Sequence, residues 1–184
     1  MTWRYRDMGG DPEGLMNYSG TRFLYRLAIL TWSQPIPWEP ESRIPMIPGA
    51  WAGHGGLYAI IRDHHSQSRP KRIAYIGVAE SFSDRLDAKH HMYPKLVERR
   101  GSTFISLGRV RFERCASTRK HLEEIEQIVT WATWEHVWNE RGMETLPGFR
   151  SGQEFKPWVI VNDGYRFHRQ MPKRIAYPAF AAST

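Results

Sequence analysis

Two tyrosines and an arginine between positions 58 and 85 are the residues whose types and spacing could do chemistry. Tyr58 ends a Gly-Leu-Tyr triplet, and Tyr75 opens a Tyr-Ile-Gly triplet. Arg85 follows, and its fork of donors suits the non-bridging oxygens of a phosphate. A phenol has an ordinary pKa of about 10, so it needs a neighbouring cation or metal ion before it can accept a proton near neutral pH. A guanidinium near two phenols could therefore bind a phosphate group.

Two short apolar runs must position the tyrosines. The runs Leu57 to Ile61 and Ile73 to Val78 are rich in β-branched and aromatic residues, and a polar connector joins them. This pattern predicts a β-hairpin with a long loop. Ser81 and Asp84 then have the spacing of a capping box, in which a hydroxyl and a carboxylate satisfy free N–H groups. A helix is therefore expected to begin there and to carry Arg85 in its first turns.

The strongest helix signal in the chain covers residues 117–133. Glu123 points away from its apolar stripe, whereas Glu124 and Glu126 lie on the two opposite edges of that stripe. An edge carboxylate can reach a cleft while its stem stays shielded. Helix geometry therefore excludes Glu123 as the best candidate for chemistry and leaves Glu124 and Glu126 open. The stripe expected to bury against a sheet consists of Leu122, Ile125, Ile128, Val129 and Ala132.

The triplets and the arginine resemble the GIY-YIG nuclease family. GLY stands for the first triplet, YIG matches the second, and Arg85 falls at the family's arginine. The resemblance implies an α+β fold: a small, mainly antiparallel, three-stranded sheet flanked by helices, with extensions at both ends. The third strand is expected at Ser102 to Phe112, where Thr, Phe, Ile and Val favour a strand. The implied activity is that of a metal-dependent endonuclease on double-stranded DNA, with Mg²⁺ or Mn²⁺ as cofactor.

By the same resemblance, Glu126 is the metal ligand. The family carries a metal-binding glutamate on this helix, followed closely by two aliphatic residues and later by an asparagine. Here Ile128, Val129 and Asn139 follow Glu126. The aliphatic residues are not quite at the family's usual offset, which leaves Glu124 as the alternative. One glutamate is enough to hold Mg²⁺, because this ion keeps several waters and needs only one or two carboxylates beside a substrate phosphate.

The resemblance also implies roles for the tyrosines and for a side chain near Arg85. One of Tyr58 and Tyr75 accepts the proton of the attacking water and the other orients it, and the sequence does not assign the two roles. Many members carry a histidine four residues after the arginine, where Lys89 stands here. Either Lys89 takes that role, or the helix unwinds and His90 turns inward. The predicted catalytic residues are Tyr58, Tyr75, Arg85, His90 and Glu126.

The net charge fits a polyanionic partner. The 184 residues carry a formal net charge of +7, with a pI near 9.8. Each Lys or Arg that meets a phosphate releases a condensed counterion, so nucleic acid is the expected partner. For any one of these residues, a solvated basic surface is an equally good interpretation. The residues predicted to contact nucleic acid are Lys89, Arg99, Arg100, Arg109, Arg111 and Asn139.

Composition indicates the compartment. No run approaches the roughly 20 apolar residues of a membrane span, and the start of the sequence lacks an apolar signal region. The lone Cys115 allows no intramolecular disulfide, which fits a reducing environment. We therefore expect a cytoplasmic protein with no membrane partner. A zinc site is not predicted, because the adjacent His64 and His65 have no third ligand.

One domain is expected over residues 1–184, with a catalytic core at 54–139 and extensions at 1–53 and 140–184. This layout looks most like the stand-alone restriction-enzyme branch of the family, in which a homodimer would be expected. Homing and phage-encoded endonucleases share the same core and are alternatives. A rival of another class is a nucleic-acid-binding protein that keeps the fold but has lost cutting, since Lys89 stands at the family's histidine position.

Each extension has its own predicted structure. Residues 22–32 are predicted to form a helix, although the shortness of the segment leaves a strand open. The Pro-rich run at 33–49 is expected to lie extended over the core. Further on, an Asn-Asp-Gly turn around Asp163 predicts a hairpin over residues 158–168. That hairpin either reads DNA or caps the core.

Overall fold

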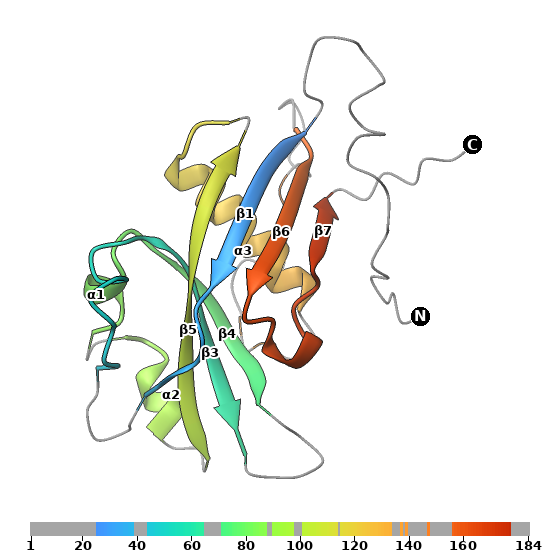
Figure 1. Cartoon of the computed structure of the whole chain (residues 1–184). Coiled ribbons are helices and arrows are strands. Elements are labelled where there is room, and N and C mark those ends of the chain that lie inside the picture. Colours follow the sequence, from blue (N-terminus) through green and yellow to red (C-terminus); the bar gives the residue numbers. More distant parts are fainter. Residues whose placement is uncertain are drawn as a thin grey trace, which may run out of the picture.

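The fold is built on one mixed sheet of seven strands (Figure 1). The computed structural model describes residues 25–38, 44–64, 71–87, 90–97, 101–113, 115–133, 137, 139, 147 and 156–177. The strand order is β4-β3-β5-β1-β6-β7, with β2 also paired to β5. β1 and β6 are parallel, and the other neighbours are antiparallel. The strands are β1 Arg26–Trp32, β2 Ile36–Pro37, β3 Gly56–Asp63, β4 Arg72–Ala79, β5 Ser102–Glu113, β6 Trp158–Gly164 and β7 Arg174–Tyr177.

The helices cover the two faces of the sheet unequally. The long helix α3, Arg119–Ala132, lies across one face, and the short helices α1, Phe82–Arg85, and α2, Tyr93–Val97, pack on the other (Figure 1). The helix predicted over 117–133 is confirmed as α3. Its N-cap is Thr118, whose hydroxyl accepts a hydrogen bond from the His121 N–H at 3.2 Å. Among the described residues, no helix combines the length and the apolar character needed to span a bilayer.

The expected fold class, with a small three-stranded sheet flanked by helices, is wrong. The three expected strands are present as β3, β4 and β5, but they form only one side of a larger sheet. β5 is twelve residues long and is paired along both edges, to β3 on one and to β1 and β2 on the other. β6 and β7 extend the sheet beyond β1. Segments expected to be extensions around a core therefore belong to the same sheet.

The helix predicted at residues 22–32 is also wrong, because the described part of that segment forms β1. Ala28, Leu30 and Trp32 are buried and alternate with less buried residues, which is the two-residue period of a strand. β1 lies between β5 and β6 and is hydrogen-bonded on both edges. Pairing with two neighbours outweighs a short and weak helical pattern, since tertiary context overrides local propensity.

The short helices correct two further expectations. Ser81 precedes α1, but its side chain makes no capping hydrogen bond, so the predicted capping box is absent. α1 is a single turn that ends at Arg85. A proline inside a helix commonly ends it, yet Pro94 is the second residue of α2. A proline is tolerated there because the first N–H groups of a helix have no partner within it.

The C-terminal hairpin exists, but its second strand is not where the sequence predicts it. β6 pairs with β7, Arg174–Tyr177, and not with residues 165–168. Gly164 ends β6 with a φ of +76°, and a Cβ there would lie 2.4 Å from the Trp32 carbonyl oxygen. The chain then forms a longer turn that contains the 3₁₀ helix η2, Phe167–Arg169. The close contact with β1 prevents an immediate reversal at Asp163.

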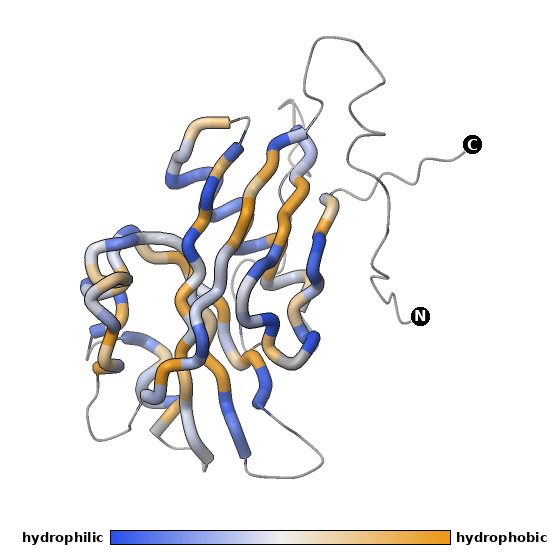
Figure 2. Tube along the Cα trace, viewed as in Figure 1, coloured by the Kyte–Doolittle hydropathy of each residue, from blue (hydrophilic) through white to orange (hydrophobic). Residues whose placement is uncertain are grey.

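The core consists of two apolar layers, one on each face of the sheet, and the central strands are its most hydrophobic part (Figure 2). Of the Pro-rich run, Trp38 is buried and Ile47 packs against the layer beneath α1 and α2, whereas Ile44 is half exposed. The layer under α3 includes Leu57, Ala59, Ile76, Ile125, Ile128 and Val129. The layer on the opposite face includes Tyr58, Ile60, Phe82, Leu86, Met92 and Leu107.

Candidate active site at the edge of strand β4

The two motif glycines permit close approaches, and Gly77 allows the Tyr58 phenol to cross strand β4. Tyr58 on β3 is paired with Gly77 on β4, and a Cβ at Gly77 would lie 2.4 Å from the Tyr58 hydroxyl oxygen. The ring fills the space where another residue would place its side chain. β4 is the edge strand of the sheet, so the phenol extends toward an open edge. Gly56 is needed for a different close approach, because a Cβ there would lie 2.1 Å from the carbonyl oxygen of Gly108 on β5.

His90, in the turn before α2, donates a hydrogen bond to this phenol. Its Nε2 lies 2.8 Å from the Tyr58 hydroxyl oxygen, and its Nδ1 accepts from the Met92 N–H at 3.2 Å. A ring nitrogen that accepts carries no proton, so the proton is on Nε2 and faces Tyr58. Burial, together with the charges of His91 and Arg85, lowers the pKa of His90 to about 4. The imidazole is therefore neutral at pH 7.

Tyr75 and Arg85 complete the group around the Tyr58 hydroxyl. The two phenol rings have centroids 6.0 Å apart, and the Tyr58 hydroxyl donates to the Tyr75 oxygen. Arg85 hydrogen-bonds to both phenol oxygens. Burial raises the pKa of Tyr58 and of Tyr75, while Arg85 acts against it by favouring phenolate. Burial alone would lower the pKa of Arg85, but the two phenols and Glu126 outweigh it and raise that pKa. Arg85 therefore stays positively charged.

Glu126 reaches the same place from α3, which lies on the other face of the sheet. The backbone N–H of Val78 donates to its carboxylate at the free edge of β4. Its charge acts on both Tyr75 and Arg85. Burial raises the pKa of Glu126 to about 7, against the opposing effects of Arg119 and Arg85. Titratable groups with shifted pKa values that cluster in one place are typical of functional sites.

Glu124, the alternative ligand, lies in a different environment. Its carboxylate is 2.6 Å from Arg26 Nη1 and accepts a hydrogen bond from Trp158 Nε1 at 2.8 Å. The Arg26 guanidinium also lies over the Trp158 ring, 5.0 Å from its centroid. Arg26 and Trp158 belong to β1 and β6, so Glu124 ties α3 to the part of the sheet that does not carry the tyrosines.

Asn139 and Arg109, both predicted to contact nucleic acid, have partners inside the protein. The Asn139 Oδ1 accepts from the Ile76 N–H at 3.1 Å, and its Nδ2 donates to the Ile76 carbonyl oxygen at 2.7 Å. Its amide therefore covers the edge of β4 one residue after Tyr75. Arg109 donates to the carbonyl oxygen of Ala50 and lies over the Trp51 ring, 4.7 Å from its centroid.

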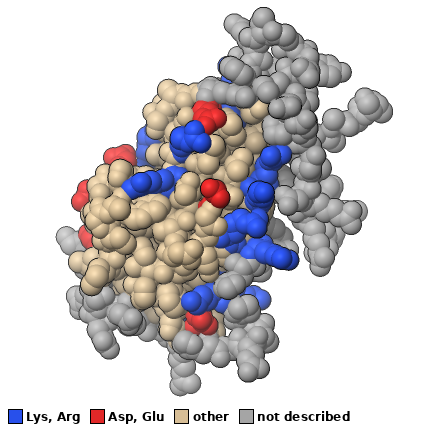
Figure 3. Space-filling view, in the orientation of Figure 1, with Lys and Arg blue, Asp and Glu red and all other residues tan. Residues whose placement is uncertain are grey.

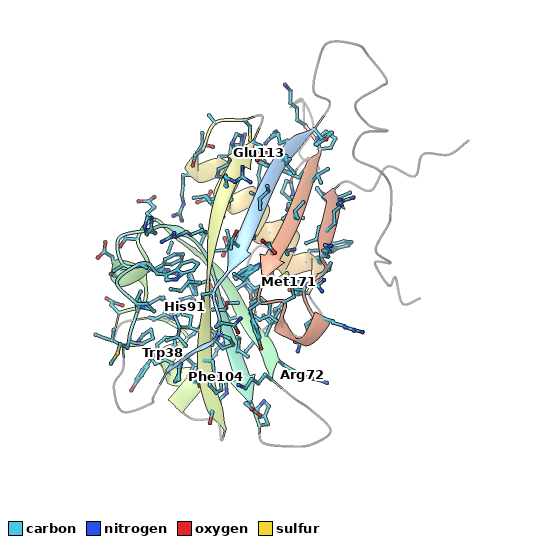
Figure 4. The ribbon with its side chains drawn as sticks, in the orientation of Figure 1. Trp38, Arg72, His91, Phe104, Glu113 and Met171 are labelled. Atoms are coloured by element: carbon cyan, nitrogen blue, oxygen red, sulfur yellow. The ribbon has the colours of Figure 1, made fainter. Side chains whose placement is uncertain are left out.

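The other predicted contacts do not gather at this edge in the described part of the chain. Arg111 forms an exposed ion pair with Glu113, at the end of β5 away from Phe104 (Figure 4). The predicted contacts Lys89, Arg99 and Arg100 lie outside the described residues. Whether Lys89 takes a catalytic role is therefore not decided, whereas His90 does turn inward.

Two aromatic neighbours of the site were not predicted. The His91 ring stacks on His90 with centroids 4.8 Å apart and meets Tyr75 edge-on at 5.2 Å. Trp38 packs edge-on against His90 at 6.0 Å. Figure 4 shows His91 and Trp38 on the side of the sheet near α2. Nothing in the sequence pairs residues 38 and 90, because they meet only once β2 adds to β5.

The donor set suits a hard divalent cation. Among the described residues, no three His, Cys, Asp or Glu side chains form a metal-binding group. Mg²⁺ and Mn²⁺ take oxygen ligands, and Mg²⁺ is held by as few as one or two carboxylates completed by waters and substrate phosphate. Glu126 is a partly buried carboxylate beside the phenols, and a cation there would relieve its loss of hydration. Glu126 thus fits Mg²⁺ or Mn²⁺.

His90 is expected to make folding less stable in acid. Its folded-state pKa of about 4 lies below its ordinary 6.5, so the unfolded chain binds more protons between these values. Stability should therefore fall as pH drops from 6.5 toward 4, by on the order of 1 kcal/mol at pH 5. His90→Gln keeps a donor for Tyr58 and should reduce this loss, measured as melting temperatures at pH 7 and pH 5. Equal losses in both proteins would contradict the buried neutral imidazole.

Comparison of the chain with protein-family models, with curated proteins and with solved structures found no match. The geometry at the edge of β4 is therefore the feature that points to a function. There, side chains from β3, β4, α1, α3 and the turn before α2 meet around two phenol oxygens.

Proposed function

We propose that the chain is a metal-dependent endonuclease that hydrolyses phosphodiester bonds of double-stranded DNA. The observation that carries the proposal is the convergence of five side chains at the free edge of β4. They are Tyr58, Tyr75, Arg85, His90 and Glu126. Packing alone does not call for a carboxyl with a pKa of about 7 beside a guanidinium and two phenols. The chemistry of these groups suits a phosphate and a cation.

Arg85 supplies the phosphate contact. It is exposed, and its raised pKa keeps it cationic near neutral pH. A guanidinium donates along two parallel directions, which matches two non-bridging oxygens of a phosphate. Those oxygens gain negative charge as water adds to phosphorus, so the contact strengthens toward the transition state.

Tyr75 is the better candidate for the general base. Tyr58 is fully buried, so its hydroxyl cannot touch an attacking water, whereas Tyr75 is partly exposed. The Tyr75 oxygen accepts hydrogen bonds from the Tyr58 hydroxyl and from Arg85, and both bonds favour phenolate. Tyr58 is then a positioning residue held by His90 Nε2 at 2.8 Å. The water proton moves to the Tyr75 oxygen as the oxygen–phosphorus bond forms, and the leaving oxygen departs on the opposite side.

Glu126 provides the remaining requirement of the reaction, which is a ligand for a divalent cation. A divalent cation held by its carboxylate would offset the charge on the phosphate and on the leaving oxygen. Glu126 must be ionised to hold a cation, and its pKa of about 7 means that protons compete with the metal near neutral pH. The same carboxylate is held in place by the Val78 N–H.

A plasmid assay tests the proposal. Supercoiled plasmid is incubated with the protein and Mg²⁺ or Mn²⁺, with and without a chelator, beside Arg85→Ala and Tyr75→Phe. We expect nicking that requires metal and that both substitutions abolish. Discrete bands after mapping of the ends would indicate a site-specific, restriction-type enzyme, and smearing a general nuclease. Chelator-insensitive binding of DNA without nicking by the unsubstituted protein would leave only a nucleic-acid-binding protein.

The rate of cleavage is expected to rise with pH. Both Glu126, with a pKa of about 7, and Tyr75, with a pKa raised above the ordinary value of a phenol, must lose protons to act. At limiting Mg²⁺ the rate should rise about a hundredfold per pH unit below pH 7, where both deprotonations are incomplete, and about tenfold per unit above pH 7, where only Tyr75 still titrates. Initial nicking rates from pH 6 to pH 9 measure this. A bell-shaped profile falling above pH 7 would contradict phenolate as the base.

A further inference from the structure

A basic turn lies near the candidate active site and has no role in the mechanism above. The turn between β6 and β7, residues 165–173, exposes Arg166, Arg169 and Lys173. Residues 158–177 contain one acidic residue, Asp163, and four basic ones, which are these three and Arg174. Figure 3 shows Lys and Arg gathered on the side of the molecule that carries β7 and this turn. No ion pair between described residues involves Arg166, Arg169 or Lys173.

The turn is held rigidly from inside. Phe167 and Met171 are buried, and the Phe167 ring packs edge-on against Trp32 with centroids 5.2 Å apart. The Asn162 side chain donates to the Pro172 carbonyl oxygen at 2.8 Å. Arg169 adopts a φ of +69°, a left-handed conformation that arginine rarely takes. Such a conformation persists only where the surrounding packing determines it.

Gln170 joins this turn to the strand that carries Tyr75. Its Oε1 accepts from the Ile73 N–H at 3.0 Å, and its Nε2 donates to the Lys71 carbonyl oxygen at 2.6 Å. Tyr75 follows Ile73 by two residues, or about 7 Å along the strand. Each strand of duplex DNA carries a phosphate about every 3.4 Å of helix axis. The turn is therefore within a few phosphates of any phosphate bound at the tyrosines.

We propose that residues 165–173 form a phosphate-binding arm, with Arg169 and Lys173 as its contacts, that holds the DNA backbone to one side of the cleaved bond. This inference rests on the proposed function. It differs from the basic residues first predicted to contact DNA, because Arg109 and Arg111 have partners within the protein. Within the described part of the chain the exposed cations of the turn have no such ion-pair partner, and Gln170 anchors the backbone that carries them, so the backbone has little order to gain on binding.

Arg169→Gly is the most informative substitution for testing the phosphate-binding arm. Glycine adopts a φ of +69° readily, so the substitution removes the charge without straining the turn. Lys156→Ala is the matched control, because it removes one exposed charge from the opposite end of β6. Lys173→Ala is the second test of the arm. Melting temperatures of all four proteins show that each is folded.

Binding is measured by fluorescence anisotropy on a duplex of about 30 base pairs, in chelator, from about 50 to 200 mM salt. Arg169→Gly should weaken binding several-fold at the higher salt and reduce the slope of log K against log salt by about 0.9, the loss of one phosphate contact. Lys173→Ala should do the same, and Lys156→Ala should leave the slope unchanged.

The outcomes separate the arm from the nuclease. If the unsubstituted protein binds and nicks DNA and Arg169→Gly and Lys173→Ala keep its affinity and salt slope, the arm is overturned and the proposed function stands. If the protein binds DNA without nicking and these two variants lose affinity, the arm stands and the nuclease assignment falls. Failure of the unsubstituted protein to bind duplex DNA would overturn both.

Discussion

Replacing Glu126 with glutamine is expected to reduce Mg²⁺-dependent DNA cleavage by roughly three orders of magnitude, or about 4 kcal/mol of transition-state stabilisation. Glutamine keeps the shape of the side chain and can still accept from the Val78 N–H. It cannot supply the negative charge that holds a divalent cation. Initial rates of plasmid nicking at saturating Mg²⁺ measure the loss.

The same substitution is expected to stabilise the metal-free protein at pH 8. The folded-state pKa of Glu126, about 7, lies above its ordinary value of 4.5, so the folded protein holds the proton more tightly than the unfolded chain. Stability contributed by the protonated form is present below pH 4.5 and is lost as pH rises through 7. Glutamine does not ionise and avoids this loss, which is on the order of 3 kcal/mol. The melting temperature should rise by about 9 °C.

Glu124→Gln is the matched control, because it removes the other candidate carboxylate from the same helix. Glu124 is paired with Arg26 and accepts a hydrogen bond from Trp158, so the substitution removes the negative charge from a largely buried ion pair. We expect the free energy of unfolding to fall by about 3 kcal/mol. Cleavage per folded molecule should be unchanged. If Glu124→Gln abolished cleavage in folded protein and Glu126→Gln did not, the two assignments would be reversed.

Gly77→Ala is expected to disrupt the site and the fold together. The new methyl group would lie 2.4 Å from the Tyr58 hydroxyl oxygen and 2.5 Å from the adjoining ring carbon. Tyr58 is fully buried, so its ring has no free space to enter, and overpacking of this kind costs about 3 kcal/mol. The phenol must also leave its hydrogen bond with His90. Chemical denaturation and the nicking assay should both show the loss.

Gly49→Ala provides the comparison for that experiment. A Cβ at Gly49 meets no atom within 4 Å. We expect a change in unfolding free energy below about 0.5 kcal/mol and no change in cleavage. Wild-type stability in Gly77→Ala would mean that the Tyr58 ring does not cross β4 at that position.

Local sequence signals were enough to predict an element where the formation of that element depends mainly on its own residues. The apolar runs around Tyr58 and Tyr75, the β-prone stretch that became β5, and the stripe of α3 all formed where the sequence predicts them. The glycine of the second triplet serves the tyrosine of the first, because Gly77 on β4 makes room for the Tyr58 ring from β3.

The larger sheet could not be predicted, because its strands depend on partners that are distant in the chain. β1 is a strand because β5 and β6 pair with its two edges, and no local feature of residues 26–32 indicates either partner. The Asp163 turn failed for a similar reason: Gly164 packs against the Trp32 carbonyl oxygen, and the chain continues to η2 before it returns.

The candidate site was predictable in its residue types but not in its arrangement. Helix geometry placed Glu124 and Glu126 on opposite edges of one stripe, and only the sheet beneath α3 decides which edge faces the tyrosines. β4 lies under the Glu126 edge, and β1 and β6 lie under the Glu124 edge. The direction of the His90 proton likewise depends on the Met92 N–H, a backbone group that no sequence motif specifies.

The edge of β4 has a consequence for the solubility of the protein. An edge strand offers unpaired N–H and carbonyl groups, which are a template for pairing with a strand of another molecule. Here three side chains occupy outward-facing groups of β4: Gln170 at Ile73, Asn139 at Ile76 and Glu126 at Val78. Glu126 therefore also hinders the addition of a strand from another molecule at this edge.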